Sequence, residues 1–415
     1  MKKLYAFIAF LLSFCLFCMP VIADIGDVIP AGIGEAATNV ATEDFLTDPY
    51  ADLGEIPTNT TAFTEVKAAT AVLMEASTGR ILFEQKPDEP LPPASVTKVM
   101  SLLLVMEAME AGKFTAETMV TASDNACSLG GSQIWLEPGE TMSVNDLLKA
   151  TCIASANDAT VALGELVAGT EEAFVAQMNA RAKELGMHNT VFMNSTGLDA
   201  TGHVTTSRDI AIMSCELLKH ELIKTYSTVW MDSLRGGQSE LVNTNKLVRF
   251  YKGAVGLKTG TTSGAGYCLS AAAVRDDMAL VSVVMGADTS NNRFNSARQL
   301  LDYGFANWSR SEVHFDTQTL PPVAVTKGVA NTLTLNEEAG VSLLVPKGKA
   351  GEVTQKLFLQ ESFEAPIAKG QALGYVVLEL EGKEIGRISL VALEDVPKMT
   401  FSAAFARILS ALFTL

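Results

Sequence analysis

The chain is short of positive charge and of long apolar segments, and each shortage excludes a class of protein. It has 415 residues, with 31 Lys and Arg against 47 Asp and Glu, so its formal charge is −16. Because a nucleic-acid-binding protein neutralises phosphates with clustered cations, this balance argues against nucleic acid as a partner. After the N-terminal segment no run of about 20 apolar residues occurs, which excludes a polytopic membrane protein. Hydrophobic residues still make up 48%, so global disorder is excluded as well.

Cysteine is also scarce, and its pattern argues against a zinc site. Six cysteines are present, two of them within the first 23 residues, which leaves 6 − 2 = 4 in the remainder. These four form no C-x-x-C pair and have no histidine pattern beside them: Cys127, Cys152, Cys215 and Cys268. A chain of this length needs no disulfide framework, so we expect these four cysteines to be small, apolar residues buried in the core. The motifs below require neither a metal nor a cofactor.

Residues 1–23 have the pattern of a secretory signal peptide. Lys2 and Lys3 form the charged start, residues 4–17 are nearly all apolar, and the segment ends in small residues at Ala23. Its removal would leave a mature charge of −16 − 2 = −18. An uncleaved anchor is the alternative, since the two differ only in length and flanks. Residues 24–65 then carry nine acids and no Lys or Arg, which predicts an acidic, flexible linker.

The C-terminal residues 397–415 have an amphipathic pattern. Large apolar residues share one face of a helix there: Phe401, Phe405, Ile408, Leu409 and Leu412. The segment is too short to span a bilayer but suits a helix that lies in the membrane interface. Amphipathicity alone equally allows packing on the protein's own core, so both interpretations stay open at this point.

Ordered structure is expected in two parts, residues 66–308 and 309–396. In the first part, two strand patterns precede a helix from about Ala94 that is apolar on nearly every side. Helical patterns, a strand meander and a last helix follow, which predicts one sheet closed by distant parts of the chain: 144–150, 158–167, 172–185, 207–218, 255–262, 267–274, 278–286 and 293–308. The second part has short strand patterns between Gly, Pro and Lys turns, which predict a small all-β domain: 323–325, 332–335, 341–345, 352–359, 374–380 and 384–390.

The first candidate for chemistry is Ser95, which lies at a helix start with Lys98 three residues later. Residues at this spacing share a helix face, so the amine can reach the hydroxyl. A serine hydroxyl is a weak nucleophile and needs a base, and a lysine can serve when burial lowers its pKa. The pattern S-x-x-K alone arises by chance about once in such a chain, and a capping serine with a solvated lysine explains it equally well.

Two further motifs carry polar groups of the same kind. Ser155 and Asn157 lie at a break before a helical pattern, where a hydroxyl could shuttle a proton and an amide could hold a substrate amide, although a helix cap explains them too. Lys258-Thr259-Gly260-Thr261 lies in a predicted strand before a hairpin turn. Lys258 could bind a carboxylate or keep Lys98 neutral by repulsion, and Gly260 lets a ligand approach the strand.

In this order the three motifs resemble the signature of class A β-lactamases and penicillin-binding proteins. The wider sequence resembles a low-molecular-mass penicillin-binding protein of the serine-type D-alanyl-D-alanine carboxypeptidase family, from about residue 67 to the C-terminus. Beyond the three motifs, the resemblance rests on short segments along the chain: 76–79, 93–98, 155–159, 196–199, 205–209, 256–260, Arg293 and 300–305. The acidic segment 24–65 is longer than this family leads us to expect.

The resemblance implies a fold and a membrane location. The fold is an α/β (α+β) serine β-lactamase/transpeptidase-like domain, with an antiparallel sheet flanked by helices and a helical subdomain, followed by a small all-β domain. The implied domains are a catalytic domain at 66–308, a β-rich domain at 309–396 and an anchor helix at 397–415. The implied location is extracytoplasmic, on the outer face of the cytoplasmic membrane, with the C-terminal helix as the anchor.

The resemblance also implies the reaction and a role for each site residue. Ser95 attacks the carbonyl between the last two D-alanines of a peptidoglycan stem peptide, Lys98 takes its proton, and Ser155 relays a proton to the leaving group. Asn157 orients Lys98 and the substrate, and the terminal carboxylate is bound by Lys258, Thr259 and Arg293. Backbone N–H groups of Ser95 and Thr261 form the oxyanion hole beside Gly260, and β-lactams inhibit by acylating Ser95. Asp199 is a lesser candidate for positioning, and the four histidines are expected to be surface or packing residues.

Two rival interpretations remain at this stage. A β-lactamase would need an efficient deacylating group, and no convincing counterpart lies near residues 190–203. A non-catalytic wall-binding protein of the same fold would not need the intact set of Ser95, Lys98 and Ser155. A Ser-His-Asp hydrolase is disfavoured because no G-x-S-x-G motif is present.

Overall fold

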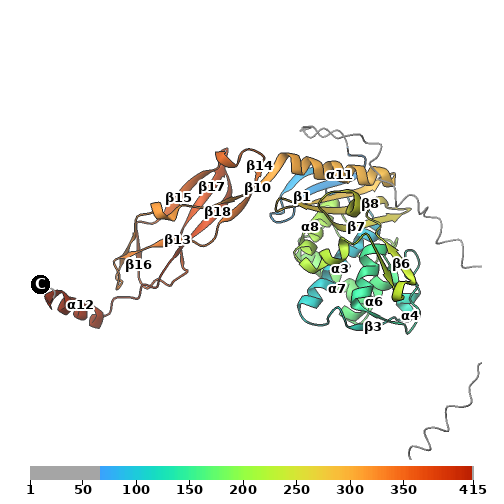
Figure 1. The fold of residues 1–415 in the computed structure, drawn as a ribbon, viewed down its shortest axis with the longest axis horizontal. Helices are drawn as coiled ribbons and strands as arrows, with labels where there is room; N and C mark the ends of the chain where they lie inside the picture. The colour runs from blue at the N-terminus through green and yellow to red at the C-terminus, as the bar shows by residue number, and fades with distance from the viewer. Residues whose placement is uncertain (1–65, 414–415) are drawn as a thin grey trace, which may run out of the picture. The chain divides into compact units, whose positions relative to one another are not determined.

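The computed structural model describes residues 66–413 (Figure 1). The predicted signal peptide at 1–23 and acidic linker at 24–65 lie outside these residues. In the part described, strands and helices build a mixed α/β region first and a β-rich region afterwards, which confirms the predicted fold class.

A five-stranded antiparallel sheet with the order β2-β1-β9-β8-β7 forms the centre of the first region. Its strands come from both ends of the region: β1 Thr70–Glu75, β2 Ile81–Gln85, β7 Ala254–Thr262, β8 Gly266–Arg275 and β9 Met278–Ala287. The early strand β1 pairs with the late strand β9, with Thr70 opposite Met285. The prediction of one sheet closed by distant parts of the chain is therefore confirmed, and β7 lies at its edge.

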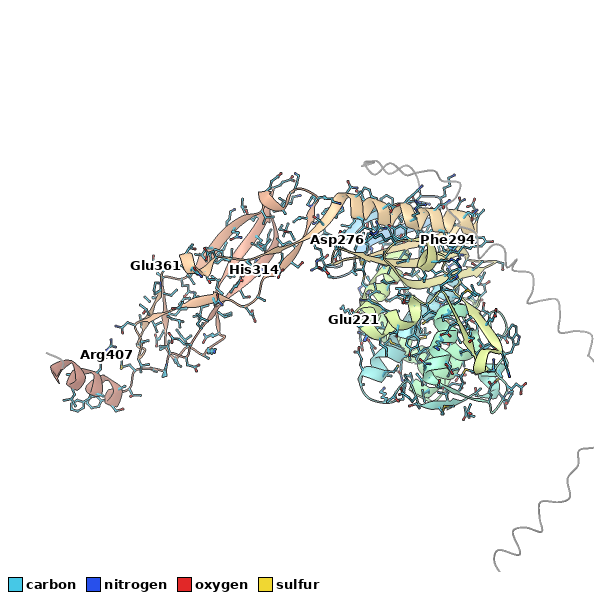
Figure 2. The ribbon with its side chains drawn as sticks, in the orientation of Figure 1. Glu221, Asp276, Phe294, His314, Glu361 and Arg407 are labelled. Atoms are coloured by element: carbon cyan, nitrogen blue, oxygen red, sulfur yellow. The ribbon has the colours of Figure 1, made fainter. Side chains whose placement is uncertain are left out.

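Alternate residues of β1 build the two cores on either face of the sheet. Val72 and Met74 pack with the helices on one face, while Ala71 and Leu73 pack with the other core. The first core contains the helices α3 (Lys98–Glu110) and α8 (Ser207–Leu218), and the second contains α11 (Ser290–Asn307). Figure 1 shows α11 and α8 on opposite sides of the sheet, and Phe294 of α11, labelled in Figure 2, is fully buried in the second core.

The remaining helices of the first region form a subdomain next to α3. They are α4 Asp124–Cys127, α5 Val144–Lys149, α6 Asn157–Ala168, α7 Glu171–Glu184, α9 Lys224–Ser227 and α10 Leu247–Phe250. The sequence predicts α5, α6 and α7 to within one residue at each end, whereas the four-residue helices α4, α9 and α10 were not predicted. Two small hairpins accompany them: β3 Met119–Thr121 with β4 Thr141–Ser143, and β5 Met231–Leu234 with β6 Ser239–Val242. The helix α3 is buried nearly all round, as its uniformly apolar sequence predicts.

The last helix of this region differs from its prediction at both ends. It begins at Ser290 rather than Arg293, because the hydroxyl of Thr289 accepts a hydrogen bond from the backbone N–H of Asn292 and caps the helix there. It ends at Asn307, because Trp308 already belongs to strand β10 (Trp308–Val313), which pairs with β14 (Val341–Pro346).

The β-rich region contains nine strands among its described residues, β10 to β18. Besides β10 and β14 these are β11 Val323–Thr326, β12 Thr332–Leu333, β13 Leu335–Glu337, β15 Thr354–Leu359, β16 Ser362–Glu364, β17 Ala372–Leu380 and β18 Lys383–Ala392. The sequence patterns missed β10 and β16, and they predict one strand over 332–335 where the structure has β12 and β13. The other strands begin and end within two residues of their predictions. A separate apolar core includes Leu343, Val376 and Ile388.

The helix α12 (Phe401–Phe413) closes the described chain. Its large apolar side chains as far as Leu409 are exposed, with Phe401 at 88% and Ile408 at 60% of full exposure, so they pack on none of the apolar cores among the described residues. Among the helices described in residues 66–413, none is long and apolar enough to cross a membrane.

Candidate active site

Ser95 lies in a short 3₁₀ turn, η2 (Ala94–Thr97), that leads directly into α3. The preceding Ala94 has a φ of +48°, a left-handed conformation that costs roughly 1–3 kcal/mol in a non-glycine residue and often marks functional sites. Two glycines allow the turn to be enclosed. A Cβ at Gly197 would lie 1.8 Å from the Ala94 carbonyl oxygen, and one at Gly260 would lie 2.9 Å from the Ser95 nitrogen. Close backbone packing therefore fixes Ser95 between a loop and strand β7.

Lys98 is completely buried and its amine has three partners. The Nζ atom lies 3.1 Å from Ser95 Oγ, 2.6 Å from Asn157 Oδ1 and 2.8 Å from the Thr196 carbonyl oxygen. The last two are obligate acceptors, whereas the serine hydroxyl can also donate. A neutral amine, with two N–H groups and one lone pair, satisfies this set completely: it donates to both carbonyl oxygens and accepts from the Ser95 O–H. The geometry is thus that of a base beside a nucleophile.

The electrostatic surroundings of Lys98 favour the same neutral form. Burial lowers the pKa of its ammonium well below the ordinary value, and the positive charge of Lys258 lowers that pKa further. Asp158 acts in the opposite direction but more weakly. Burial and the charge of Lys258 therefore both favour the uncharged amine of Lys98 relative to that of an exposed lysine.

Ser155 follows a π-helical turn, η3 (Ala150–Ala154), and has the left-handed backbone angles φ +65° and ψ +28°. Such turns are rare and recur at functional sites. The side chain is 4% exposed, and its Oγ atom has no hydrogen-bond partner among residues 66–413. The unusual backbone thus presents a buried hydroxyl whose hydrogen-bonding capacity is unused.

Asn157 and Asp158 join the start of α6 to the segment around residues 130–136. The Asn157 Nδ2 atom donates to the Gly130 carbonyl at 2.6 Å, which leaves its Oδ1 facing Lys98. The Asp158 carboxylate accepts from the backbone N–H groups of Ile134 and Leu136 at 3.1 Å. The helix-cap interpretation of this motif is wrong, because the N-cap of α6 is Ala156, which makes no side-chain hydrogen bond. The Asn157 side chain binds Lys98 and another loop instead.

Lys258 lies on β7 with its side chain 1% exposed, and its Nζ donates to the Thr259 carbonyl at 3.1 Å. Burial lowers its pKa to about 7, an effect that Arg293 reinforces. The Thr259 hydroxyl donates to Thr244 Oγ1 at 2.7 Å. The motif therefore supplies a cation that lacks a carboxylate partner among the described residues.

Arg293 extends from α11 to the other end of the same motif. Its Nη1 donates to Thr261 Oγ1 at 3.1 Å and to the Gly260 carbonyl at 3.2 Å, and its side chain is 6% exposed. Burial lowers its pKa to about 10, so the guanidinium stays charged at neutral pH. The sequence-predicted residues of the third motif and Arg293 therefore converge on one stretch of β7.

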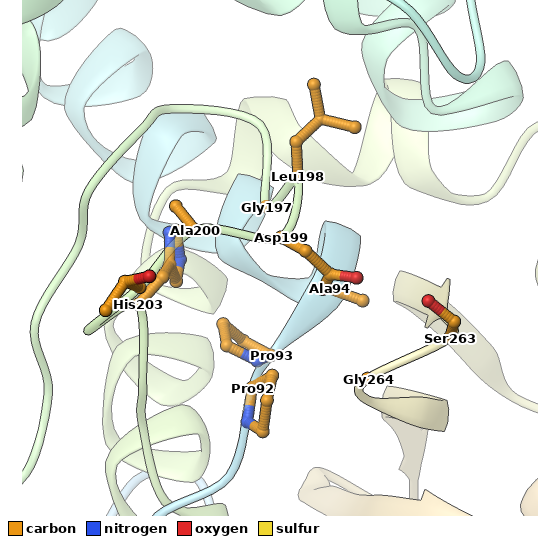
Figure 3. Close-up of a pocket in the computed structure, with 11 residues that line it drawn as sticks. Pro92, Pro93, Ala94, Gly197, Leu198, Asp199, Ala200, His203, Ser263 and Gly264 are labelled. Atoms are coloured by element: carbon orange, nitrogen blue, oxygen red, sulfur yellow. The ribbon is translucent and has the colours of Figure 1, made fainter.

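A cavity of about 440 Å³ lies beside the Ser95 turn (Figure 3). One wall is the loop Gly197–His203 and another is the pair Pro92 and Pro93, with Ser263 and Gly264 of the β7–β8 turn opposite. Asp199 lines this cavity and accepts a hydrogen bond from Thr262 Oγ1 at 2.7 Å, which ties the loop to the end of β7.

Several supporting groups gave no signal in the sequence. The Thr196 carbonyl receives the Lys98 amine, and His203 contacts Thr97 inside the S-x-x-K turn through its Nε2, at 2.9 Å. The backbone N–H of Met193 donates to His203 Nδ1, so Nε2 carries the proton and donates to Thr97. Burial lowers the pKa of His203 to about 4, so it stays neutral, and the prediction that it is a packing residue is confirmed.

The cysteine thiols take no part in the side-chain contacts above, although Arg293 Nη1 also donates to the backbone carbonyl of Cys268 at 3.3 Å. Cys152, Cys215 and Cys268 are buried and Cys127 is half-buried, and all four are free thiols. Their prediction as small packing residues is confirmed for the three buried ones.

Comparison with known proteins agrees with this geometry. Residues 57–289 match the family described as D-alanyl-D-alanine carboxypeptidase, and residues 308–398 match the C-terminal domain of penicillin-binding protein 5. The chain is 42% identical over 339 residues to the D-alanyl-D-alanine carboxypeptidase DacF of Bacillus subtilis, which covers 81% of this chain and 87% of that protein.

Solved structures give the same result. The crystal structure of penicillin binding protein 5 from Haemophilus influenzae superposes with a TM-score of 0.72 at 32% identity, covering 81% of this chain and 99% of that one. Penicillin-binding protein D2 from Listeria monocytogenes, solved in its ampicillin-bound form, has a TM-score of 0.54 at 31% identity, covering 59% of this chain and 100% of that one.

Proposed function

Because the chain belongs to the D-alanyl-D-alanine carboxypeptidase family, we propose that it is a serine-type D-Ala-D-Ala carboxypeptidase that removes the terminal D-alanine from peptidoglycan pentapeptide stems. One observation carries the proposal. The buried Lys98 amine lies 3.1 Å from the Ser95 hydroxyl, and its other two partners are carbonyl oxygens. This arrangement directs the lone pair of the amine at the serine proton.

In the first step Ser95 Oγ attacks the carbonyl carbon of the penultimate D-alanine while Lys98 accepts the hydroxyl proton. The oxyanion forms between the backbone N–H groups of Ser95 and Thr261. The close approach of β7 to the Ser95 turn at Gly260 supports this assignment. In other acyl-transfer enzymes one such donor contributes about 3 kcal/mol to the stability of the transition state.

In the second step the C–N bond breaks and the leaving D-alanine takes a proton through Ser155, whose buried hydroxyl is free to accept and donate one. Asn157 orients Lys98 and the substrate amide, and the terminal carboxylate binds to Lys258, Thr259 and Arg293. Water then hydrolyses the ester on Ser95 and releases the shortened stem. A β-lactam, which carries a carboxylate and a reactive amide, acylates Ser95 by the same first step.

The location follows from both ends of the chain. Residues 1–23 direct secretion across the cytoplasmic membrane, residues 24–65 form a flexible acidic linker, and the catalytic domain spans 66–308. Residues 309–396 form the β-rich domain, and 397–415 attach peripherally to the outer face of the membrane. The exposed side chains of Phe401, Phe405 and Ile408 on α12 support this attachment, since they form an apolar face that no described residue covers.

The activity is tested by measuring D-alanine release from diacetyl-L-Lys-D-Ala-D-Ala. We expect Ser95→Ala to abolish the release and the covalent benzylpenicillin adduct seen by mass spectrometry, with circular dichroism unchanged. An unchanged rate in this variant would refute the assignment. Rapid turnover of benzylpenicillin by the wild type, with no D-alanine release, would favour a β-lactamase instead.

The attachment has its own test. Deletion of residues 397–415 should move the enzyme from the membrane fraction to the soluble fraction and leave its activity on short peptides at the wild-type level. Membrane partition that is unaltered by the deletion would remove this role from α12.

A further inference from the structure

The cavity beside the Ser95 turn contains a carboxylate that the proposed reaction does not use. Asp199 is exposed in this cavity, and its Oδ1 accepts from Thr262 Oγ1 at 2.7 Å. Within residues 66–413 no lysine, arginine or histidine lies within ion-pair distance of it. A Cβ built on Gly264 would lie 3.6 Å from either carboxylate oxygen, so the charge lies directly over the β7–β8 turn.

The position of the cavity relative to β7 identifies the part of a substrate that reaches it. Strand β7 is the edge of its sheet, so an extended peptide can lie along its unpaired side. With the terminal carboxylate at Lys258 and Thr259 and the scissile carbonyl at Thr261, the peptide runs antiparallel to β7. At about 3.3 Å per residue, the third stem residue then lies beside Thr262–Gly264.

The cavity has the size and chemistry for a long, cationic side chain at that position. Its volume of about 440 Å³ exceeds that of an alkyl chain, and Pro92 and Pro93 supply apolar surface for methylene groups. Figure 3 shows the Gly197–Ala200 loop facing Ser263 and Gly264 across this space. The carboxylate of Asp199 is then the partner available for a terminal ammonium.

We propose that this cavity is the subsite for the third stem residue and that Asp199 binds the free ammonium at the end of its side chain. The inference rests on the proposed carboxypeptidase function and deepens it. It makes the preferred substrate a stem whose third residue carries an unacylated amine. A cross-linked stem, in which this amine has become an amide, loses the charge and is a poorer substrate.

The wild-type enzyme alone provides the first test. The kcat/KM for D-alanine release is compared between Nα-acetyl-L-Lys-D-Ala-D-Ala, whose ε-amine is free, and the Nα,Nε-diacetyl peptide. We expect the free amine to be preferred by about threefold to tenfold, and the preference to shrink at high salt because partly exposed charges are screened. Equal rates for the two peptides would overturn the subsite while leaving the proposed function intact. Cleavage of neither peptide would overturn both.

Variants assign the preference to one side chain. Asp199→Asn keeps an oxygen for Thr262 but removes the charge, so the ratio of the two kcat/KM values should fall to about one. Asp199→Glu should keep a preference for the free amine. Asp277→Asn is the matched control, since it removes one negative charge from the exposed β8–β9 turn and should keep the wild-type ratio. Benzylpenicillin acylation verifies that each variant is folded, and a preference that survives in Asp199→Asn would overturn the proposal.

Discussion

The cations of the candidate active site and those of the β-rich region are in different environments. Lys98, Lys258 and Arg293 are 0%, 1% and 6% exposed, and within residues 66–413 none of them forms an ion pair with an acid. In the β-rich region several exposed lysines pair with carboxylates, as between Lys356 and Glu379 at 2.6 Å or Lys327 and Glu364 at 2.9 Å. Figure 2 shows His314 of this region, which pairs with Glu337 at 2.8 Å.

We interpret this difference as one between cations with a proposed role in the reaction and cations that are hydrated at the surface. Burying an ammonium without a carboxylate partner destabilises the folded protein, and it is also what lowers the pKa of the amine. An exposed pair has neither effect, because water solvates both charges and screens their attraction. Under the proposed mechanism, the buried amines destabilise the folded protein but have the lowered pKa that the reaction needs, a trade-off common at functional sites. Substitutions that remove or replace a lysine in one of the two environments test this interpretation.

The largest effect is expected for Lys98→Met, which removes the amine but retains most of the volume of the side chain. Without a base beside Ser95, D-alanine release and benzylpenicillin acylation should both fall by about a thousandfold or more. Steady-state release and quenched-flow acylation measure the two losses. A variant that still acylates within tenfold of the wild-type rate would show that another group activates Ser95.

The second effect concerns stability and is expected for Lys258→Met. Because the wild-type ammonium is buried without a carboxylate, the variant should be more stable by about 1–3 kcal/mol at pH 7, although its kcat/KM falls. Urea unfolding of the full chain measures the difference. A less stable variant would mean that Lys258 contributes a structural interaction beyond its hydrogen bond to the Thr259 carbonyl.

The gain in stability from Lys258→Met should depend on pH in a defined direction. The pKa of Lys258 is about 7 in the folded protein, below its ordinary value of 10.5. Between these values the unfolded chain binds more protons than the folded protein, so wild-type stability rises with pH relative to the variant. The difference in free energy of unfolding should be largest below pH 7 and vanish as the pH approaches 10.5. A difference independent of pH would contradict the lowered pKa.

A third prediction concerns the pH profile of benzylpenicillin acylation. In the free enzyme the ammonium of Lys258 is lost as the pH rises past about 7, so the second-order rate constant should decline on the alkaline side. In Lys258→Arg the guanidinium keeps its charge, and the decline should move up by about 2 pH units or more, at a lower maximal rate. An unchanged alkaline midpoint would mean that a different group titrates there.

Patterns that depend on local periodicity were predictable from the sequence. The helix α8 has the bounds Ser207–Leu218 that its apolar spacing predicts. No strand of the meander β7 to β9 differs from its predicted range by more than one residue at either end. The three motifs could be located in the same way, because each lies at a helix start or on a strand. Strand β10 was missed because it begins directly after α11. No glycine or proline marks the boundary between Asn307 and Trp308, and the helical apolar spacing continues across it.

Contacts set by tertiary packing were not predictable. The Thr196 carbonyl that receives Lys98 is a backbone atom 98 positions away, and such an atom has no signature in the sequence. The left-handed backbone of Ser155 follows from the π-helical turn before it, which helical periodicity does not reveal. The contact between His203 and Thr97 likewise joins a loop to a motif across 106 positions. Sequence patterns therefore identified the candidate reactive groups, whereas the groups in contact with them could be found only in the structure.

The smallest effect is expected for Lys356→Met, the same substitution as at Lys98 but placed in the β-rich region. Lys356 is 58% exposed and Glu379 is 17% exposed, so breaking their ion pair should change the free energy of unfolding by less than about 0.5 kcal/mol. D-alanine release from short peptides should stay at the wild-type rate. Urea unfolding and steady-state kinetics at two salt concentrations measure both quantities. A tenfold loss of activity, or a destabilisation above about 1 kcal/mol, would show that surface ion pairs of this region stabilise the protein or its candidate active site. The proposed difference between the two environments would then be contradicted.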